Sequence, residues 1–495
     1  MNPFAQFYTS TDHLSIVPAI MLVLFGCGIL LIDFLMFPDP RQRKWLLVLV
    51  ALAESLTLYG LWQQRDFLAG NGLSELAGFQ GSVTVDGFSI FYNAIFVVAA
   101  LIVAAASYKY LDIAGEHHGE YYGLMLLAQC GMYFLATGTD LVTLFIGLET
   151  MALSFYVLVG FLRAEKRSNE AALKYLLLGA FSSGFLAYGF SIMYGLAGST
   201  KLVDVAAAIG ARPAWDPMVF LALATTAVGL LFKISAVPFH MWAPDAYVGA
   251  PTPVTAYLST ASKAASIAFL LRIFLGPFGG ARETWEPLLA AVALATLTVG
   301  NLAAISQTNL KRLLAYSSIS HAGYMLLGLV AGNETGIKGI AVYLMVYTFM
   351  NLGAFLVIVA LRRQGLMGED LDDVAGLMRR SPGYAILMLI FLLSLAGIPP
   401  TAGFLGKYYI FLSLIETGHY VLAVVAVLYV AVAIYYYFKI VRSMFIREEG
   451  EQAGTAPLAT SFGLRLALGV SVVGTLVIGI YPEPFIRLAQ TSLVR

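Results

Sequence analysis

The sequence predicts an all-α polytopic membrane protein. Of its 495 residues, 59% are hydrophobic and only 12% are charged, which leaves too little polar surface for a water-soluble chain of this length. About fourteen apolar runs are long enough to cross the roughly 30 Å hydrocarbon core of a bilayer. Several runs nevertheless contain a charged residue, although a charge at the bilayer centre costs about 2.5–3.5 kcal/mol on insertion scales. We therefore expect about 14 transmembrane helices whose buried charges carry the function.

The expected helices follow one another through short loops. They span residues 14–36, 45–62, 88–108, 121–137, 140–162, 171–195, 217–248, 252–275, 286–306, 313–331, 337–361, 383–415, 419–441 and 464–486. The first run has no basic start and no small-residue cleavage signal, so we interpret it as a helix and not as a removed signal peptide. Before the third helix, the stretch FQGSVTVDGF alternates apolar and polar residues and predicts a short external strand or hairpin. In the longest inner loop, EDLDDVAGLMRRSP predicts a short amphipathic helix.

The basic residues predict the orientation of the chain. When alternate loops are assigned to one side of the membrane, that side collects 17 of the 29 Lys and Arg and the other side has 8. The remaining four are Lys174, Lys233, Lys263 and Lys407, which lie within the expected helices. Cytoplasmic loops carry the excess of Lys and Arg, so the first side is predicted to be cytoplasmic. With an even number of helices, both termini then lie on the outer face.

Two expected helices are too long and are interrupted by proline. The seventh breaks at SAVPFHMWAP and the twelfth at AGIPPTAGF, because proline removes a backbone donor and clashes with the preceding turn. Broken helices at corresponding positions are typical of inverted-repeat transporters with a site at the breaks. We expect four segments. They are residues 1–120 with three helices and the hairpin, a first five-helix repeat at 121–275, a second inverted repeat at 286–445, and a C-terminal helix in 464–495.

Composition and motifs argue against several classes of protein. The formal net charge is zero, which gives no reason to expect a nucleic-acid partner. Cys27 and Cys130 are too few to ligate an iron–sulfur cluster, and no structural zinc spacing occurs. The sequence has neither a GxGxxG after a strand nor a GxxxxGKS loop. We therefore expect no cofactor and no metal on this chain.

Four charged residues are the strongest functional candidates. Glu149, Lys233, Lys263 and Lys407 lie in the middle of long apolar helices or beside a break. Lys233 precedes Pro238 by five residues, where opened carbonyl groups and water can solvate its charge. An acid and several bases without a soluble domain around them indicate a machine that moves protons.

Five further titratable residues are weaker candidates. Lys174 lies about one turn inside its helix, where it either belongs to the path or extends to the cytoplasmic interface. His240 follows the first break and His321 lies inside the tenth helix, so both lie beside the expected path, although a lone histidine is more often a packing group. For Glu54 and Asp33 we prefer a structural or partner-contact interpretation.

Four stretches resemble a known family. They are FIGLETMALSFYVLVGF, FKISAVPFHMWAPDAYVGAPTPVTAYLSTASKAA, NLKRLLAYSSISHAGYMLLG and LAGIPPTAGFLGKYYIF. With them the chain resembles, over about residues 80–445, the antiporter-like membrane subunits of respiratory complex I, the NADH-quinone oxidoreductase. Within the family it is most similar to subunit N. Lys407 stands where subunit M has a glutamate, and the chain ends shortly after its last helix, where subunit L continues into a long lateral helix.

The resemblance implies a proton path and a role for each residue. The family's path residues fall on Glu149, Lys233, Lys263 and Lys407, with Lys174 and His240 as accessory groups. To these we add His321 from its position. Lys233 and Glu149 would form an ion pair, Lys263 would relay protons laterally, and Lys407 would hand them to the outer side.

The resemblance also implies partners and an energy source. The chain would be a subunit of a proton-translocating enzyme in the bacterial inner membrane, without a redox centre of its own. FMN, iron–sulfur clusters and quinone would belong to other subunits, and the neighbouring antiporter-like subunit and the small membrane subunits would contact this chain. The alternative is a subunit of a multisubunit sodium/proton antiporter, which shares the second stretch. A purely structural membrane scaffold is a further alternative, but it leaves the buried charges unexplained.

Overall fold

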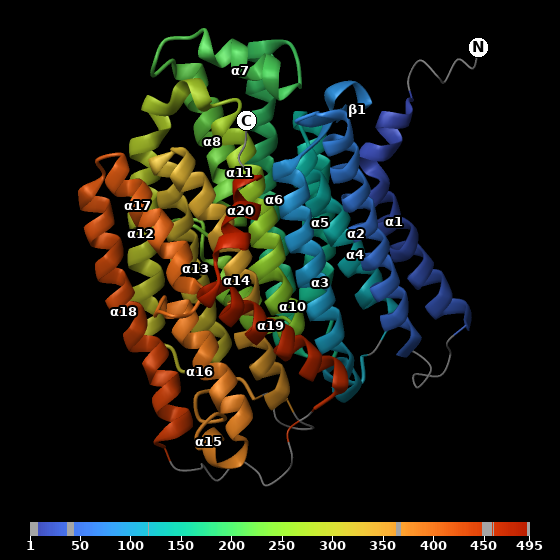
Figure 1. Cartoon of the computed structure of the whole chain (residues 1–495), viewed down its shortest axis with the longest axis vertical. Coiled ribbons are helices and arrows are strands. Elements are labelled where there is room, and N and C mark those ends of the chain that lie inside the picture. Colours follow the sequence, from blue (N-terminus) through green and yellow to red (C-terminus); the bar gives the residue numbers. More distant parts are fainter. Residues whose placement is uncertain are drawn as a thin grey trace.

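The chain folds into a bundle of long helices. The computed structural model describes residues 8–36, 44–116, 118–362, 368–447, 458 and 460–492. In Figure 1 most helices run along the long axis of the bundle, with the short helix α7 (Leu202–Gly210) at one end and α15 (Leu377–Arg380) at the other. We refer to these as the α7 end and the α15 end. The described residues nearest the two termini both lie toward the α7 end.

The unbroken helices confirm the predicted all-α membrane fold. They are α1 (Ser10–Met36), α2 (Trp45–Asn71), α3 (Gly87–Ala114), α4 (Gly119–Thr137), α5 (Leu141–Val159), α6 (Lys166–Ala197), α12 (Arg282–Ile305), α13 (Leu310–Ala331), α14 (Glu334–Leu361), α18 (Tyr420–Phe445) and α19 (Phe462–Ile480), followed by the short α20 (Glu483–Gln490). Among the described residues, 11 helices are long and apolar enough to cross a membrane. This set includes the span Thr252–Leu275 and does not include α4. Helix α4 and two broken helices occupy the other predicted spans, so the number of actual crossings stays a prediction.

Both predicted helix breaks are confirmed. Helix α8 (Pro217–Lys233) is separated from α9 (Trp242–Gly249), and α16 (Pro382–Ala396) from α17 (Gly403–Glu416). Each connecting segment contains a cis X–Pro peptide bond. Helix α8 begins at the α7 end and α16 at the α15 end, so the two broken helices run in opposite directions (Figure 1).

The start of the first broken helix is well defined by its sequence. The Asp216 side chain accepts hydrogen bonds from the backbone N–H groups of Met218 and Val219, and Pro217 occupies the first helical position. The hydrogen bond from Val219, with smaller contributions from Met218 and Arg212, holds the pKa of Asp216 below its usual range, although desolvation opposes this shift. This N-cap fixes where the chain enters the bundle from the α7 end.

The predicted hairpin is also confirmed, and its external location stays a prediction. Strands β1 (Glu75–Gly78) and β2 (Val83–Asp86) pair antiparallel between α2 and α3. The connection holds Phe79, Gln80 and Gly81 at positive φ, which turns the chain back within a few residues. The first strand ends just before the FQGSVTVDGF stretch. The first residues of this stretch form the turn, and the second strand follows them.

The predicted amphipathic helix at residues 369–382 is largely wrong. Only the four residues of α15 and the first residue of α16 are helical there, and turns occupy residues 371–376. The Asp373 carboxylate accepts from the backbone N–H of Asp370, and Gly376 has φ 65°. Aspartate side chains that bond their own backbone compete with helix formation. Burial raises the pKa of the Asp373 carboxyl.

The eighth predicted helix is not uniform. It consists of α10 (Thr252–Tyr257), a π-helical turn η4 (Leu258–Ser262) and α11 (Lys263–Leu275). This span, α13 and α14 are almost entirely buried, whereas only 28% of α18 and 33% of α19 are buried. The three buried spans therefore form the centre of the bundle, and all three contribute to the site below.

Candidate functional site

Three lysines are buried inside the bundle. The side chains of Lys233, Lys263 and Lys407 are only 5%, 2% and 3% exposed. Lys233 is the last residue of α8, Lys263 follows the π-helical turn, and Lys407 lies one turn into α17. A buried ammonium group requires oxygen partners, and each of these lysines lies next to an irregular part of a helix.

Lys407 is held by the end of the preceding half-helix. Its Nζ donates to the carbonyl oxygens of Leu395 at 3.0 Å and Ala396 at 2.8 Å, which belong to the last turn of α16. The final carbonyls of a helix have no intrahelical donor and carry its partial negative charge. The ring of Tyr324 lies 5.0 Å from the same ammonium group. The second break therefore creates the binding site for the Lys407 side chain.

Lys263 is bound to a serine of the neighbouring helix α13. Its Nζ donates to the carbonyl oxygen of Ser318 at 2.6 Å and to the Ser318 hydroxyl at 2.5 Å. The Tyr347 hydroxyl of α14 donates to the same hydroxyl at 2.9 Å. Ser318 thus connects α11, α13 and α14 at the centre of the bundle.

The π-helical turn before Lys263 is fixed by a side chain of α14. The Asn351 amide donates to the hydroxyls of Ser259 at 2.8 Å and Thr260 at 3.0 Å. Single π-turns inside α-helices are frequent at functional sites. The turn changes the rotation of α11 relative to α10 and so contributes to the direction of the Lys263 side chain.

His321 lies between the two lysines. Its Nδ1 is hydrogen-bonded to the Tyr343 hydroxyl at 2.5 Å and its Nε2 to the Tyr437 hydroxyl at 3.1 Å. The ring interacts electrostatically with both Lys407 and Lys263. We call Lys263, Ser318, His321 and Lys407 the central row.

Aromatic side chains lie between Lys233 and the central row. The ring of Tyr156 stacks edge-on against Tyr175 with centroids 4.7 Å apart, and Tyr175 stacks on Trp242 at 4.5 Å. Trp242 in turn contacts Tyr247 at 6.1 Å, whose hydroxyl interacts with Ser318 of the central row.

Glu149 and Lys233 do not touch each other in this conformation. The Ser183 hydroxyl donates to Glu149 Oε1 at 2.5 Å, and Lys233 Nζ donates to the Tyr156 hydroxyl at 3.4 Å. Tyr156 follows Glu149 by two turns on α5, so it occupies the place beside the lysine. Glu149 is only partly buried and lies on the α5–α6 flank. The expected direct ion pair is therefore not formed between these two described residues.

Lys174 and His240 lie outside the central row. Lys174 is 47% exposed and pairs with Glu170 at 2.8 Å and Asp245 at 3.0 Å, which links α6 to α9. His240 lies half-buried in the first break, and its Nδ1 has no hydrogen-bond partner among the described residues.

Glu54 and Asp33 are also separate from the central row. Glu54 is fully buried and accepts a hydrogen bond from the Gln129 amide at 2.9 Å, which ties α2 to α4. Asp33 accepts from the backbone N–H of Gly119 at 2.7 Å and so ties α1 to the start of α4.

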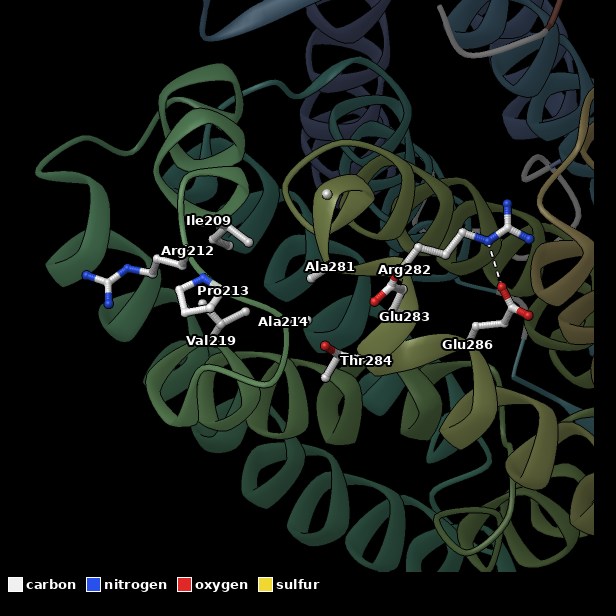
Figure 2. Close-up of a pocket in the computed structure, with 11 residues that line it drawn as sticks. Ile209, Arg212, Pro213, Ala214, Val219, Ala281, Arg282, Glu283, Thr284 and Glu286 are labelled. Carbon is white, nitrogen blue, oxygen red and sulfur yellow. Dashed lines mark hydrogen bonds and ion pairs between the residues drawn. The ribbon is translucent and has the colours of Figure 1, made fainter.

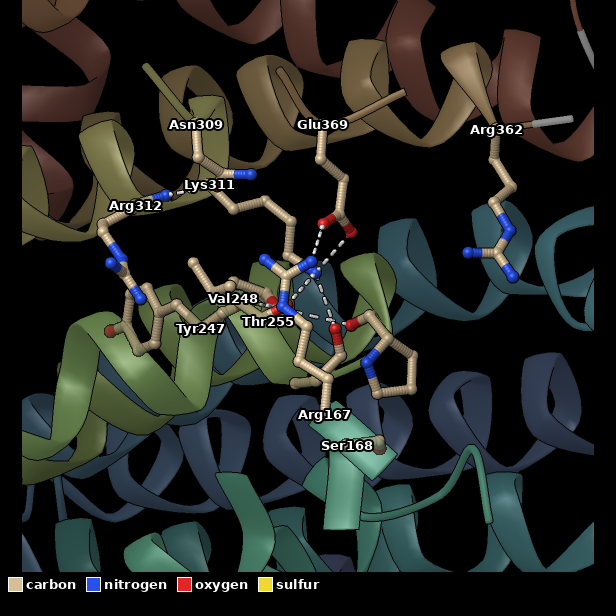
Figure 3. Close-up of polar contacts among 12 residues, drawn as sticks. Arg167, Ser168, Tyr247, Val248, Thr255, Asn309, Lys311, Arg312, Arg362 and Glu369 are labelled. Carbon is tan, nitrogen blue, oxygen red and sulfur yellow. Dashed lines mark hydrogen bonds and ion pairs between the residues drawn. The ribbon is translucent and has the colours of Figure 1, made fainter. Parts of the chain in front are cut away.

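The sequence analysis missed the polar partners of the lysines. Tyr343, Tyr347 and Asn351 recur every fourth residue and therefore share one face of α14, a spacing that could have been found. Lys311 lies between the expected helices 286–306 and 313–331 and was therefore expected in a loop, whereas the structure buries this side chain to 1% exposure beside Glu369 (Figure 3).

A cavity of about 350 Å³ opens at the α7 end between the α7–α8 loop and the start of α12. Figure 2 shows the guanidinium groups of Arg212 and Arg282 pointing in opposite directions, and Arg282 pairs with Glu286 at 2.7 Å. None of the lining residues belongs to the central row. Within the described ranges, no three His, Cys, Asp or Glu side chains are grouped to hold a metal ion.

The chain is similar to known proteins over its whole length. Residues 138–433 match the family described as NADH:quinone oxidoreductase/Mrp antiporter, TM. The chain is 77% identical over 495 residues to NADH-quinone oxidoreductase subunit N 2 of Solibacter usitatus, with 100% of both chains covered. It is 44% identical over 484 residues to subunit N 2 of Rhizobium meliloti, with 97% of each covered.

Two solved structures share the fold. A chain of respiratory complex I from Thermus thermophilus with bound aureothin is 32% identical, with a TM-score of 0.78 and 96% of this chain and 99% of that chain covered. A chain of the Mrp complex from a Dietzia species is 22% identical, with a TM-score of 0.84 and 98% and 97% covered. The second likeness concerns the fold alone.

Proposed function

The chain belongs to the subunit N branch of the antiporter-like membrane subunits of NADH-quinone oxidoreductase, and from this premise we propose that its own buried side chains conduct the protons. It is a proton-translocating membrane subunit with other complex I subunits as partners. The observation that carries the proposal is the central row. Two buried lysines are bound to oxygen atoms, one directly after a π-helical turn and one after a helix break, with a histidine between them.

The arrangement supports a defined order of proton transfer. The Ser318 hydroxyl accepts a proton from Lys263 and at the same time gives its own proton onward, and Tyr247 and Tyr347 are the further partners of this hydroxyl. His321 can take up a proton on one ring nitrogen and give one from the other, so it passes the proton toward Lys407. Lys407 then releases it toward the α7 end. Lys233 supplies protons to Lys263 across the aromatic side chains. A change in the charge of Glu149 alters how readily Lys233 releases its proton.

The proposal includes the orientation and the segments of the chain. We assign the α15 end to the cytoplasm and the α7 end and both termini to the outer face of the bacterial inner membrane. The excess of Lys and Arg in the loops at the α15 end supports this orientation. The opposite directions of the two broken helices support two inverted repeats at 121–275 and 286–445, between the N-terminal segment of residues 1–120 and the C-terminal helix in 464–495.

The energy for transport comes from outside this chain. We place FMN, the iron–sulfur clusters and quinone in the partner subunits and no redox centre on this chain. Its own contribution to the enzyme is proton transfer. A sodium/proton antiporter subunit is the second candidate, and the shared fold with the Mrp chain favours it only at the level of architecture.

The first test replaces the two charges at the start of the path. We expect Lys233→Ala and Glu149→Ala to reduce proton translocation per NADH oxidised by about tenfold or more, because a proton carrier in the transfer step contributes at least that much. Glu149→Asp retains the carboxylate and should keep some of the activity. The measurement uses membrane vesicles in which assembly of the whole complex is verified.

The control for this test is Lys109→Ala. Lys109 is exposed and forms a surface ion pair with Asp112 at 2.9 Å, so its loss should leave pumping unchanged. Normal pumping by an assembled Glu149→Ala complex would contradict the role of Glu149. Pumping that depends on sodium in place of NADH oxidation would favour the antiporter.

A further inference from the structure

A buried ion pair lies at the α15 end of the bundle, apart from the central row. Lys311 Nζ donates to Glu369 Oε1 at 2.8 Å and to the carbonyl oxygens of Val248 at 3.1 Å and Ala250 at 2.7 Å. The side chains of Lys311 and Glu369 are 1% and 5% exposed. Figure 3 shows the two side chains pointing toward each other from α13 and the segment before α15. The three donors of the ammonium group are therefore all used.

The carboxylate of this pair is incompletely satisfied. Glu369 Oε2 is buried and has no hydrogen-bond partner among the described residues. This oxygen forms an ion pair with Arg167, whose Nη1 lies 3.4 Å away and whose side chain is 47% exposed. A buried carboxylate oxygen that accepts no hydrogen bond is unfavourable, even when an ion pair partly compensates its charge. The oxygen can therefore still accept a proton, and it lies beside the arginine side chain that reaches the surface.

The ion pair lies on the same face of α13 as the central row. Lys311 and Ser318 are seven residues apart, which is two helical turns or about 10 Å. The chain segment that accepts from Lys311 also reaches Ser318, because Tyr247 precedes Val248 and its hydroxyl interacts with the Ser318 side chain. Ser318 in turn holds Lys263. The pair therefore connects the α15 end to the centre of the bundle.

We propose that Glu369 and Lys311 together form the site at which this chain takes up protons from the α15 side of the membrane. The proposal rests on the proton conduction proposed above. It adds two residues and a starting point to a path that would otherwise begin in the bundle interior.

The transfer step is balanced in protons and charge. A proton from water binds Glu369 Oε2 and neutralises the carboxylate. Lys311 then lacks its counter-charge and faces Arg167 and Arg362, which repel its ammonium group. It releases one proton toward Ser318 and Lys263, across a gap that requires water. The proton on Glu369 moves to the Lys311 amine, which restores the ion pair.

Two variants separate proton uptake from a purely structural role. Lys311→Arg keeps the charge and the hydrogen-bond donors, but arginine does not release a proton. The double variant Lys311→Met with Glu369→Leu removes both charges without leaving one buried and unpaired, a change that is often neutral for stability. If the pair only holds α9 and α13 together, both variants should pump normally.

We expect both assembled variants to lose proton translocation per NADH oxidised by about tenfold or more. The matched control is Asp372→Asn, which breaks an exposed ion pair with Arg447 at the same end of the bundle and should change nothing. Lys233→Ala is measured in parallel. If Lys233→Ala fails to pump while both Lys311 variants pump fully, the uptake site is wrong and the proposed function stands. If Lys233→Ala also pumps fully, the proposed function itself fails.

A measurement on the unmodified complex covers the case in which neither variant assembles. An apolar carbodiimide reacts with protonated carboxyl groups, and peptide mass analysis identifies the modified position. During NADH oxidation we expect Glu369 to be labelled, because the proposed step protonates it transiently. Absence of label on Glu369 during turnover, in a complex whose other buried carboxyls react, overturns the proposal.

Discussion

Lys407 illustrates how the surroundings stabilise a single buried charge. A lysine in an apolar helix is unfavourable, but the last two carbonyls of α16 are themselves without intrahelical donors. The carbonyl groups at the end of α16 therefore stabilise the buried ammonium group, and the ammonium group supplies the hydrogen-bond donors that these carbonyls lack. The site is therefore stable with the ammonium in place.

Substitution of Lys407 separates charge from proton transfer. Lys407→Arg preserves a cation and donors for the carbonyls of Leu395 and Ala396, but it cannot deprotonate. We expect both Lys407→Arg and Lys407→Ala to reduce proton translocation per NADH by about tenfold or more, whereas Lys407→Glu retains some of it, because a carboxyl also carries protons. Full pumping by both the arginine and the alanine variants would reduce Lys407 to a packing residue.

The sequence reveals charged residues of the site more readily than neutral ones. Lys233, Lys263 and Lys407 are conspicuous because charge is rare in membrane helices. Ser318 and Tyr347 are ordinary residues in such helices, and their role depends on which helices pack together. Lys311 was missed because it lies beside loop residues in the sequence, and its burial follows from Glu369, which is 58 residues away.

At the scale of elements, the breaks were predictable and the π-helical turn was not. Proline at residues 238, 399 and 400 excludes a continuous helix whatever the surroundings. The sequence of η4 contains no such residue. The turn is held by Asn351, which lies 92 residues from Ser259 in the chain. A local pattern cannot report a geometry that a distant side chain stabilises.

Removal of the Asn351 amide tests the importance of this turn. Asn351→Leu has a similar volume but leaves the hydroxyls of Ser259 and Thr260 without their donor, and an unsatisfied buried polar group costs about 1–3 kcal/mol. We expect a lower thermal midpoint of the assembled complex and reduced proton translocation, because Lys263 loses its orientation toward Ser318. Asn71→Leu is the control, since Asn71 is exposed and its side chain bonds within α2. Unchanged pumping in Asn351→Leu would show that the turn does not direct Lys263.

At the scale of the whole molecule, the loops that are rich in Lys and Arg lie together at one end of the bundle. Ion pairs between Arg167 and Glu369 and between Arg447 and Asp372 join distant loops at the α15 end. These loops are the ones that the positive-inside rule assigns to the cytoplasm. The α7 end instead carries the hairpin and α7 itself (Figure 1). The structure thus gathers at one end the loops that the sequence assigns to one side, and the orientation itself stays a prediction.

Cysteine labelling tests this orientation directly. The background replaces Cys27 and Cys130, and single cysteines are introduced as Gly279→Cys and Arg379→Cys. Both positions are exposed, and a side chain at Gly279 meets no neighbouring atom within 4 Å. A membrane-impermeant maleimide added to inside-out vesicles should label Arg379→Cys but not Gly279→Cys, and intact spheroplasts should give the reverse. A reporter fused after Arg495 should lie on the same outer face as Gly279. Labelling of both cysteines from one side would mean an even number of crossings between the two positions, where α12, α13 and α14 predict an odd one, and the two inverted repeats would then have to be redrawn.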